Sequence, residues 1–187
     1  MIDKIVNLPD SASLIPLTCR TYAIVDTGNL RNLNLYRWSL AGYKKGTRYA
    51  RRSEKGQTIY MHREIMNAPE GMEIDHINGN GLDNRSANLR ICTKAQNQQN
   101  SKKRTGKSSV FKGISWETDR KKWRASIVVN KKRICIGRFI SEIDAAKAYD
   151  VEALSYFGEY ARTNFKESNI EPSNAGYQNP PMAGTIT

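Results

Sequence analysis

A loop dense in asparagine, glycine and aspartate constrains the fold more than any other feature of this sequence. It covers residues 77–84 and lies between an extended segment at 72–76 and a short apolar stretch at 89–92. Its residue types tolerate left-handed backbone and form Asx turns, which suits a tight connection. Thr93 and Gln96 follow with the spacing of a capping box, so a helix should begin at Lys94. Residues 70–100 are therefore predicted to form strand, loop, strand and helix.

A carboxylate and an imidazole stand together at the end of the first of these strands, as Asp75 and His76. A divalent ion that holds a phosphate needs hard oxygen ligands on a rigid frame. Asp75 can supply one oxygen, and Asn97, near the first turn of the helix, can supply another. His76 can take a proton from an attacking water. An isolated Asp-His pair is more often a chance pair or a capping aspartate, so the wider sequence has to decide.

Positive charge is concentrated in one segment. Residues 101–140 hold 13 Lys or Arg and 2 acidic residues, whereas the other 147 residues hold 17 basic and 16 acidic ones. Such a block attracts a polyanion by releasing its condensed counterions. A basic run alone can also be a solvated tail. Here aromatic and β-branched residues are interleaved with the charges, which indicates a folded surface.

The flanking segments supply the other expected elements. Residues 1–60 are predicted to be mostly β, with strands at 22–26 and 35–40 and a hairpin that pairs 49–52 with 58–61. A short helix is expected from His62 to Ala68, before Pro69. Three strands are expected at 112–116, 122–129 and 133–139. A helix capped by Ser141 should then run to about Phe157.

These elements predict an α+β chain with two small domains. The first has a β-rich region at 1–60 that leads into a core at 61–100. A polar, basic linker at 101–108 should join it to the second domain at 109–166, a three-stranded antiparallel sheet packed on one helix. Residues 167–187 are expected to be a disordered tail, because Pro, Gly, Asn and Ser dominate there.

The core closely resembles the HNH homing-type endonucleases of phages and mobile introns. The resemblance rests on the string from Ile74 to Thr93 with Asn97 after it, covers about residues 15–100, and is most specific across 61–97. It implies a ββα-metal finger. His76 would then be the general base, Asn88 would brace the loop and orient His76, and Asp75 and Asn97 would be metal ligands.

The implied ligands also suggest the metal. A carboxylate and an amide oxygen favour Mg²⁺, with Mn²⁺ as a substitute. Zinc is not expected, because Cys19, Cys92 and Cys135 form no CxxC pair. Two further residues match the family pattern without a single role. His62 can contact DNA or the site, or it can serve packing or helix capping. Arg90 can hold a phosphate or close the finger through a hydrogen bond.

Residues 109–166 resemble the Apetala-two or ethylene-response-factor DNA-binding domain of plants. The resemblance rests on the strings 110–116, 122–125, 136–139, 145–150, 156–158 and 164–165. That family lays its sheet in the major groove, where arginines can pair with guanine. The matching positions are Trp116, Trp123, Arg124 and Arg133. Phosphate contacts are expected from Lys112, Lys122, Lys131, Lys132 and Arg138. Because strand side chains alternate, one of Trp123 and Arg124 should face the helix and the other should face outward.

The resemblances together predict a metal-dependent endonuclease that hydrolyses phosphodiester bonds in duplex DNA, as a site-directed, homing-type enzyme. The alternative is a sequence-specific DNA-binding regulator with an inactive nuclease core. The retained Asp75, His76, Asn88 and Asn97 argue against that alternative. An RNA-binding accessory protein is disfavoured, because nothing resembles an RNA-recognition fold.

The setting of the protein is also an expectation at this point. No apolar run approaches the roughly 18 residues that span a bilayer, and no secretory signal is apparent, so no membrane partner is expected. Reduced cysteines fit the cytoplasm of a bacterial or phage-infected cell. A monomer is favoured, and a single site would then nick one strand.

Overall fold

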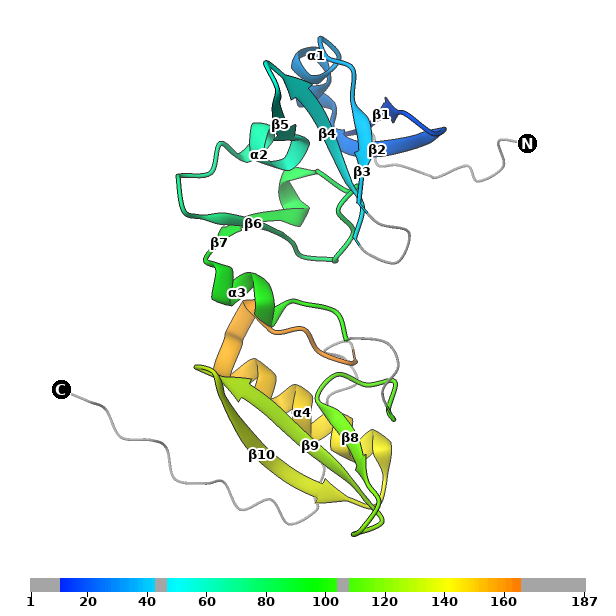
Figure 1. Ribbon diagram of the computed structural model, residues 1–187, viewed down its shortest axis with the longest axis vertical. Helices are drawn as coiled ribbons and strands as arrows, with labels where there is room; N and C mark the ends of the chain where they lie inside the picture. The colour runs from blue at the N-terminus through cyan, green and yellow to red at the C-terminus, as the bar shows by residue number, and fades with distance from the viewer. Residues whose placement is uncertain (1–10, 43–46, 104–107, 166–187) are drawn as a thin grey trace, which may run out of the picture. The chain divides into compact units, whose positions relative to one another are not determined.

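The computed structural model describes residues 11–42, 47–103 and 108–165. The chain divides into two compact units, one ending at Lys102 and the other beginning at Lys103. Both contain strands and helices, as the α+β prediction requires (Figure 1). Residues 104–107 of the predicted linker and the tail predicted at 167–187 lie outside the described residues. Within the described ranges, no helix is long and apolar enough to cross a membrane.

The first unit contains seven strands and three α-helices among its described residues. In chain order they are β1 (Ala12–Leu17), β2 (Thr21–Asp26), α1 (Leu30–Leu33), β3 (Ser39–Ala41), β4 (Tyr49–Glu54), β5 (Gln57–Tyr60), α2 (Met61–Met66), β6 (Glu73–His76), β7 (Leu89–Cys92) and α3 (Lys94–Gln99). The strands make three antiparallel sheets, in the orders β1-β2, β3-β4-β5 and β6-β7. Short 3₁₀ turns lie at Thr27–Asn29 and Ser86–Asn88.

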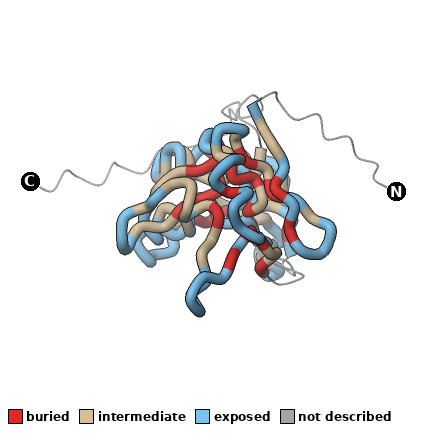
Figure 2. Tube along the Cα trace, turned by 90° about the horizontal axis from the view of Figure 1, so that it is seen from above, coloured by how far each residue is buried: buried red, intermediate tan, exposed pale blue. Residues whose placement is uncertain are grey.

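One apolar core joins the N-terminal elements of this unit. It contains eight buried side chains, from β1, β2, α1, β4, α2 and the residue before β3: Ile15, Leu17, Ala23, Val25, Leu33, Trp38, Ala50 and Met61. The predicted hairpin is confirmed, because β4 pairs with β5 across the turn at Lys55 and Gly56. Figure 2 colours the trace by burial, with buried residues in red and exposed residues in pale blue.

Two sequence-based expectations for this unit need correction. The strand predicted at 35–40 is wrong for most of its length, because β3 begins only at Ser39. Trp38 explains the difference: its ring is 2% exposed and its indole N–H donates to the carbonyl of Leu33 at 2.8 Å, which holds the chain in a turn after α1. The helix expected up to Ala68 ends at Met66, where Asn67 takes a left-handed conformation with a φ of 42°.

The second unit is a three-stranded antiparallel sheet packed on one long helix, as predicted. Its elements are β8 (Ile114–Glu117), β9 (Lys122–Val129), β10 (Lys132–Phe139) and α4 (Glu142–Phe157), followed by a 3₁₀ turn at Gly158–Tyr160. The strand order is β10-β9-β8. The oxygen of Ser141 caps α4 by accepting from the backbone N–H of Asp144, and Gly158 follows its last turn.

The sheet and α4 approach each other closely because of small residues at their contact. Ala125 on β9 and Ala145, Ala146 and Ala153 on α4 are all completely buried. Gly113 permits a further close approach just before β8. Its φ is +81°, and a Cβ there would collide with the ring of Tyr149. A side chain at position 113 would therefore push the sheet away from α4.

A buried carboxylate fastens the end of the described chain to this domain. Asp150 on α4 is fully buried and accepts hydrogen bonds from the backbone N–H of Asn164 at 2.8 Å, its side-chain amide at 2.9 Å and the backbone N–H of Phe165 at 2.9 Å. The side-chain oxygen of Asn164 accepts from the backbone N–H of Lys112 at 2.6 Å. Asp150 and Asn164 thus tie α4, the C-terminal segment and the start of the sheet together.

Removal of this carboxylate should destabilise the second unit strongly. We expect Asp150→Ala to lower its free energy of unfolding by about 3 kcal/mol, because three part-buried N–H donors lose their acceptor at roughly 1 kcal/mol each. Amide hydrogen exchange in α4 measures the effect. The control is Asp144→Ala on the exposed first turn of the same helix, which should cost less than about 1 kcal/mol. Equal protection in both variants would contradict the structural role of Asp150.

Candidate active site

The predicted strand, loop, strand and helix form at the predicted place. β6 pairs with β7 so that Asp75 lies opposite Arg90 and His76 opposite Leu89. The capping box of α3 is confirmed: the Thr93 hydroxyl oxygen accepts from the backbone N–H of Gln96 at 3.3 Å, and the Gln96 side-chain oxygen accepts from the backbone N–H of Thr93 at 2.8 Å. The two strands and the helix place one end of β6 against α3.

Asn88 closes the loop between β6 and β7. Its side chain is buried, its oxygen accepts from the backbone N–H of Asn78 at 3.0 Å, and its amide donates to the carbonyl of Asp83 at 2.7 Å. The backbone carbonyl of Asn88 also accepts from the N–H of Ile77, the residue after His76. Asn88 therefore holds both sides of the loop next to His76.

The same loop is held from outside by β2. The backbone N–H of Ile24 donates to Leu82 at 2.8 Å, and the N–H of Asn84 donates to Ile24 at 2.7 Å. At the end of β2, the Asp26 carboxylate accepts from both the N–H and the hydroxyl of Ser86. The N-terminal hairpin therefore supports a loop that lies about sixty residues later in the chain.

Within the loop, Asp83 is a charged anchor. Its carboxylate accepts from the guanidinium of Arg85 at 2.8 and 2.7 Å and from the side-chain amide of Asn78 at 2.9 Å. The hydrogen bonds from Arg85 hold the pKa of Asp83 below its usual value. Asp83 therefore stays ionised and serves the structure of the loop.

His76 is buried at the end of β6, with 5% of its surface exposed. Burial lowers its pKa from the ordinary value, although the hydrogen bond with Asn84 opposes this shift, so the imidazole is neutral near pH 7. Nε2 lies 3.3 Å from the side-chain oxygen of Asn84. With that oxygen as acceptor, Nε2 carries the proton and Nδ1 keeps its lone pair. A neutral imidazole with a free lone pair is the form that a general base requires.

His62 lies next to His76 in a cluster of rings. Its ring stacks on Tyr60 with centroids 5.5 Å apart and meets His76 edge-on at 5.1 Å. Burial, followed by the charges that His76 and Arg63 can carry, lowers its pKa to about 3. Tyr49 completes the cluster, 5.6 Å from His76. Gly81 allows this packing, because a Cβ there would lie 2.6 Å from the Tyr49 ring.

Asp75 is also buried, and both of its oxygens accept hydrogen bonds. Oδ2 accepts from Arg90 at 2.7 and 3.0 Å, and the side-chain amide of Asn100 donates to Oδ1 at 2.9 Å and to Oδ2 at 3.0 Å. The Arg90 guanidinium thus donates to the Asp75 carboxylate, a contact of the kind expected if Arg90 closes the finger through a hydrogen bond. Sequence reasoning missed Asn100. Its position three residues after Asn97 on a short polar helix was the available signal.

Asn97 lies on α3 with its side-chain amide donating to the carboxylate of Glu73 at 2.7 Å. Asp75, His76 and Asn97 line one cavity of about 210 Å³. Its other lining residues are Thr47, Tyr49, Ile74, Gly79, Asn100, Ser101 and Lys102. The structure therefore brings together a buried carboxylate, a neutral imidazole and an amide from three positions of the predicted site.

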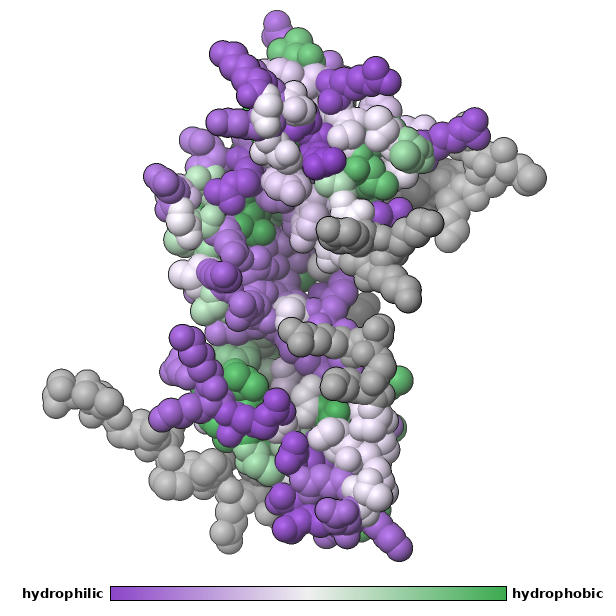
Figure 3. Space-filling model, viewed as in Figure 1, coloured by the Kyte–Doolittle hydropathy of each residue, from purple (hydrophilic) through white to green (hydrophobic). Residues whose placement is uncertain are grey.

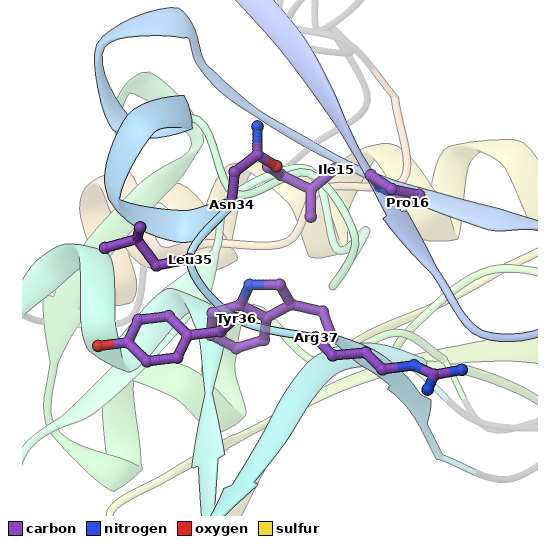
Figure 4. A pocket seen from close by; sticks show the side chains of 7 residues that line it. Ile15, Pro16, Asn34, Leu35, Tyr36 and Arg37 are labelled. Carbon is purple, nitrogen blue, oxygen red and sulfur yellow. The ribbon is translucent and has the colours of Figure 1, made fainter.

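A larger cavity of about 390 Å³ lies elsewhere in the first unit. It is lined by Ile15, Pro16, Asn34, Leu35, Tyr36, Arg37 and Trp38 (Figure 4). No acid or imidazole is among these residues. A general base and oxygen ligands occur together only in the smaller of the two cavities, so its chemistry identifies that cavity as the candidate active site.

Three arginines of the second unit, Arg124, Arg133 and Arg138, lie on the face of its sheet that points away from α4. Arg124 lies opposite Ser115 and Arg138, and all three face away from α4 because their strand neighbours form the core. Glu117 lies among the arginines, with its carboxylate 3.2 Å from Arg124 and 2.6 Å from Arg138. Hydrophilic residues gather at the end of the sheet where β8 and β9 connect (Figure 3).

The other cations expected to contact DNA differ in exposure. Arg133 is exposed on the outer face and donates to the Ser126 hydroxyl at 3.3 Å. Exposed lysines near the ends of β9 and β10 are Lys122, Lys131 and Lys132. Lys112 differs from these, because burial lowers its pKa to about 8. Lys112 is only partly exposed, whereas Lys122, Lys131 and Lys132 are exposed.

The two tryptophans lie on the opposite face of the sheet. Trp116 and Trp123 are directly paired across β8 and β9, and their rings meet edge-on at 5.0 Å. Trp123 packs against the core beneath α4, whereas Trp116 is 39% exposed. Of Trp123 and Arg124, the tryptophan therefore faces the helix and the arginine faces outward.

Comparisons with known proteins identify the class of enzyme. A family model described as HNH endonuclease matches residues 67–99. The uncharacterized HNH endonuclease L560 of Acanthamoeba polyphaga mimivirus is 30% identical over 150 residues, which cover 77% of this chain and 75% of that protein. The chain therefore belongs to the HNH endonuclease family, and the prediction that it is a nuclease is confirmed.

Two further relatives match parts of the chain. Protein 3.8 of Escherichia phage T7 is 37% identical over 65 residues, which are 35% of this chain, and the match spans about half of that protein, 54% of its length. The AP2-like ethylene-responsive transcription factor AIL5 of Arabidopsis thaliana is 30% identical over 81 residues, or 42% of this chain and 14% of the factor.

Proposed function

We propose that this HNH endonuclease hydrolyses phosphodiester bonds of duplex DNA in a metal-dependent, site-directed reaction of the homing type. The observation that carries the proposal is the convergence of Asp75, His76 and Asn97 on one cavity. His76 is the general base. Its neutral imidazole takes the proton of a water as that water attacks phosphorus. Asn88 keeps the loop closed and so holds His76 in place.

Asp75 and Asn97 would hold the metal, and the donor set fits Mg²⁺. Oδ1 of Asp75 accepts one hydrogen bond within the described residues, so it retains a lone pair for a cation, while Oδ2 is taken by Arg90 and Asn100. Hard oxygen ligands from one carboxylate and one amide suit Mg²⁺, with water and phosphate as further ligands, and Mn²⁺ can substitute. When bound, the ion would neutralise charge that develops on the phosphate. Among the described residues, no group of three His, Cys, Asp or Glu side chains is arranged to hold a metal.

The outer face of the β8–β9–β10 sheet is the proposed DNA-binding surface. Arg124 and Arg133 are the proposed base contacts, and Lys122, Lys131, Lys132 and Arg138 the proposed phosphate contacts. The likeness to an AP2-like ethylene-responsive transcription factor supports this assignment. Trp116 and Trp123 are proposed to support the sheet from the other face, because Trp123 packs against the core and Trp116 contacts its ring. The phage and mimivirus relatives support activity inside an infected host cell.

Incubation of the pure full-length chain with supercoiled plasmid tests the proposal. We expect relaxed circular product with Mg²⁺ or Mn²⁺ and no product in EDTA, since phosphodiester hydrolysis here requires the ion. Relaxed product alone fits a monomer that nicks, whereas linear product requires two sites to act together. DNA binding without cleavage under any metal would instead support the DNA-binding regulator. Cleavage that persists in EDTA would overturn the proposed metal site.

A further inference from the structure

Two carboxylates of β6 contact two asparagines, one on α3 and one directly after its last residue, in the same order along the chain. Glu73 and Asp75 are two residues apart on a strand and therefore share one face. Asn97 and Asn100 are three residues apart and therefore lie on one side of α3 and its end. The side-chain amide of Asn97 donates a hydrogen bond to Glu73, and that of Asn100 donates one to Asp75. The helix is therefore attached to the strand by two successive amide–carboxylate contacts.

The contact between Glu73 and Asn97 determines which way the Asn97 amide points. The Asn97 side-chain nitrogen donates to the Glu73 carboxylate at 2.7 Å, where it meets an acceptor oxygen. The Asn97 oxygen then points away from Glu73. Asn97 lines the cavity and Glu73 does not. The oxygen of Asn97 is therefore the atom left available to the cavity.

A metal ligand at this position must offer oxygen and not nitrogen. An amide can rotate by 180° at little steric cost, because its oxygen and nitrogen have nearly the same size. With Glu73 absent, both orientations of Asn97 become accessible, and one of them presents N–H groups to the cation. Asp75 does not face this ambiguity, because both of its terminal atoms are oxygens.

We propose that Glu73 is a positioning residue that selects the metal-binding orientation of Asn97. This inference rests on the proposed function, because it assumes that Asn97 is a ligand. Glu73 acts through its acceptor oxygen and does not contact the ion. Groups that orient metal ligands typically change metal affinity by about 10- to 100-fold when they are removed. Glu73 extends the site by a residue that neither the sequence motif nor the cavity lining identifies.

Metal binding without DNA separates this role from catalysis. Isothermal titration calorimetry with Mn²⁺ would compare wild type with Glu73→Ala, Glu73→Gln and Gln98→Ala. We expect Glu73→Ala to weaken Mn²⁺ binding by about 10- to 100-fold. Glu73→Gln keeps an acceptor oxygen but adds a donor, so it should retain part of the preference and lose less affinity than Glu73→Ala. Gln98 is exposed on α3 and serves as the control that leaves binding unchanged.

Plasmid cleavage against Mn²⁺ concentration supplies the second measurement. In Glu73→Ala the curve should shift to higher Mn²⁺, while the rate at saturation returns close to that of wild type, a pattern that general destabilisation does not produce. Melting temperatures of the four proteins check that each is folded.

The outcomes distinguish this inference from the proposed function. Wild-type protein that binds no Mn²⁺ would overturn both. Binding by wild type with equal affinity in Glu73→Ala would overturn the role of Glu73 alone. Equal loss in Glu73→Gln and Glu73→Ala would also overturn it, because an acceptor oxygen at position 73 would then have no effect on Mn²⁺ binding. A large loss in Glu73→Ala with a clearly smaller loss in Glu73→Gln is the result that supports it.

Discussion

Replacement of His76 by alanine is expected to slow plasmid cleavage by about 10²- to 10⁴-fold, the usual contribution of a general base. DNA affinity should stay close to that of wild type, because the imidazole acts in the chemical step and the proposed DNA-binding surface lies in the other unit. Single-turnover cleavage measures the rate, and fluorescence anisotropy with labelled duplex DNA measures the affinity.

His62 provides the matched control for this experiment. His62→Phe keeps a ring of similar shape against Tyr60 and His76 but removes both nitrogens. If His62 serves packing, this variant keeps most of the cleavage rate. A large loss of cleavage in His62→Phe together with near-normal cleavage in His76→Ala would show that cleavage needs His62 and not His76. That result would overturn the proposed mechanism.

Binding of duplex DNA is expected to depend steeply on salt. If the basic surface neutralises about 5 to 8 phosphates, log affinity should fall against log salt with a slope of roughly −4 to −7. A fourfold rise in salt would then weaken binding by roughly 10²- to 10⁴-fold. The reason is the concentration of positive charge in residues 101–140, which hold 13 basic and 2 acidic residues. Anisotropy titrations at several salt concentrations measure the slope.

Single substitutions on this surface should fall into two groups. Arg124→Ala or Arg133→Ala should cost about 1 to 3 kcal/mol and relax sequence preference, because these arginines are proposed to read bases. Lys131→Ala should weaken all sequences alike and flatten the slope by about one, as loss of a phosphate contact does. Salt-insensitive binding would contradict the proposed surface. So would full affinity and specificity in a chain that lacks the second unit.

Short-range patterns predicted much of this fold from sequence. The capping box of Thr93 and Gln96, the β4–β5 hairpin and the helix capped by Ser141 each depend on residues a few positions apart, and each occurs as predicted. Local hydrogen bonds and turn preferences act within one segment and need no tertiary context. The strand predicted at 35–40 was wrong because a tertiary contact decides this segment. Burial of Trp38 in the core overrides the alternation of apolar and polar residues on which the prediction rested.

The candidate site divides in the same way. Asp75, His76 and Asn97 were recognisable because they belong to one continuous motif, and the structure brings them to one cavity. Glu73 and Asn100 were not recognised, because a glutamate on a strand and an asparagine at a helix end are common on protein surfaces. Their meaning depends on the docking of α3 on β6, which pairs residues 24 and 25 positions apart.

By itself, the sequence determined the order of the elements from residue 49 onward, the family of the nuclease core and the segment that carries the positive charge. Only the tertiary structure decided that Asp26 of the N-terminal hairpin holds the loop at Ser86 and that Arg90 and Asn100 donate hydrogen bonds to Asp75. It also decided that Trp116 and Trp123 lie on the face of the sheet that Arg124 does not occupy. The physical reason is that these contacts join distant segments. Which partners meet is set by burial of a shared core and by satisfaction of buried polar groups, and neither can be read from local spacing.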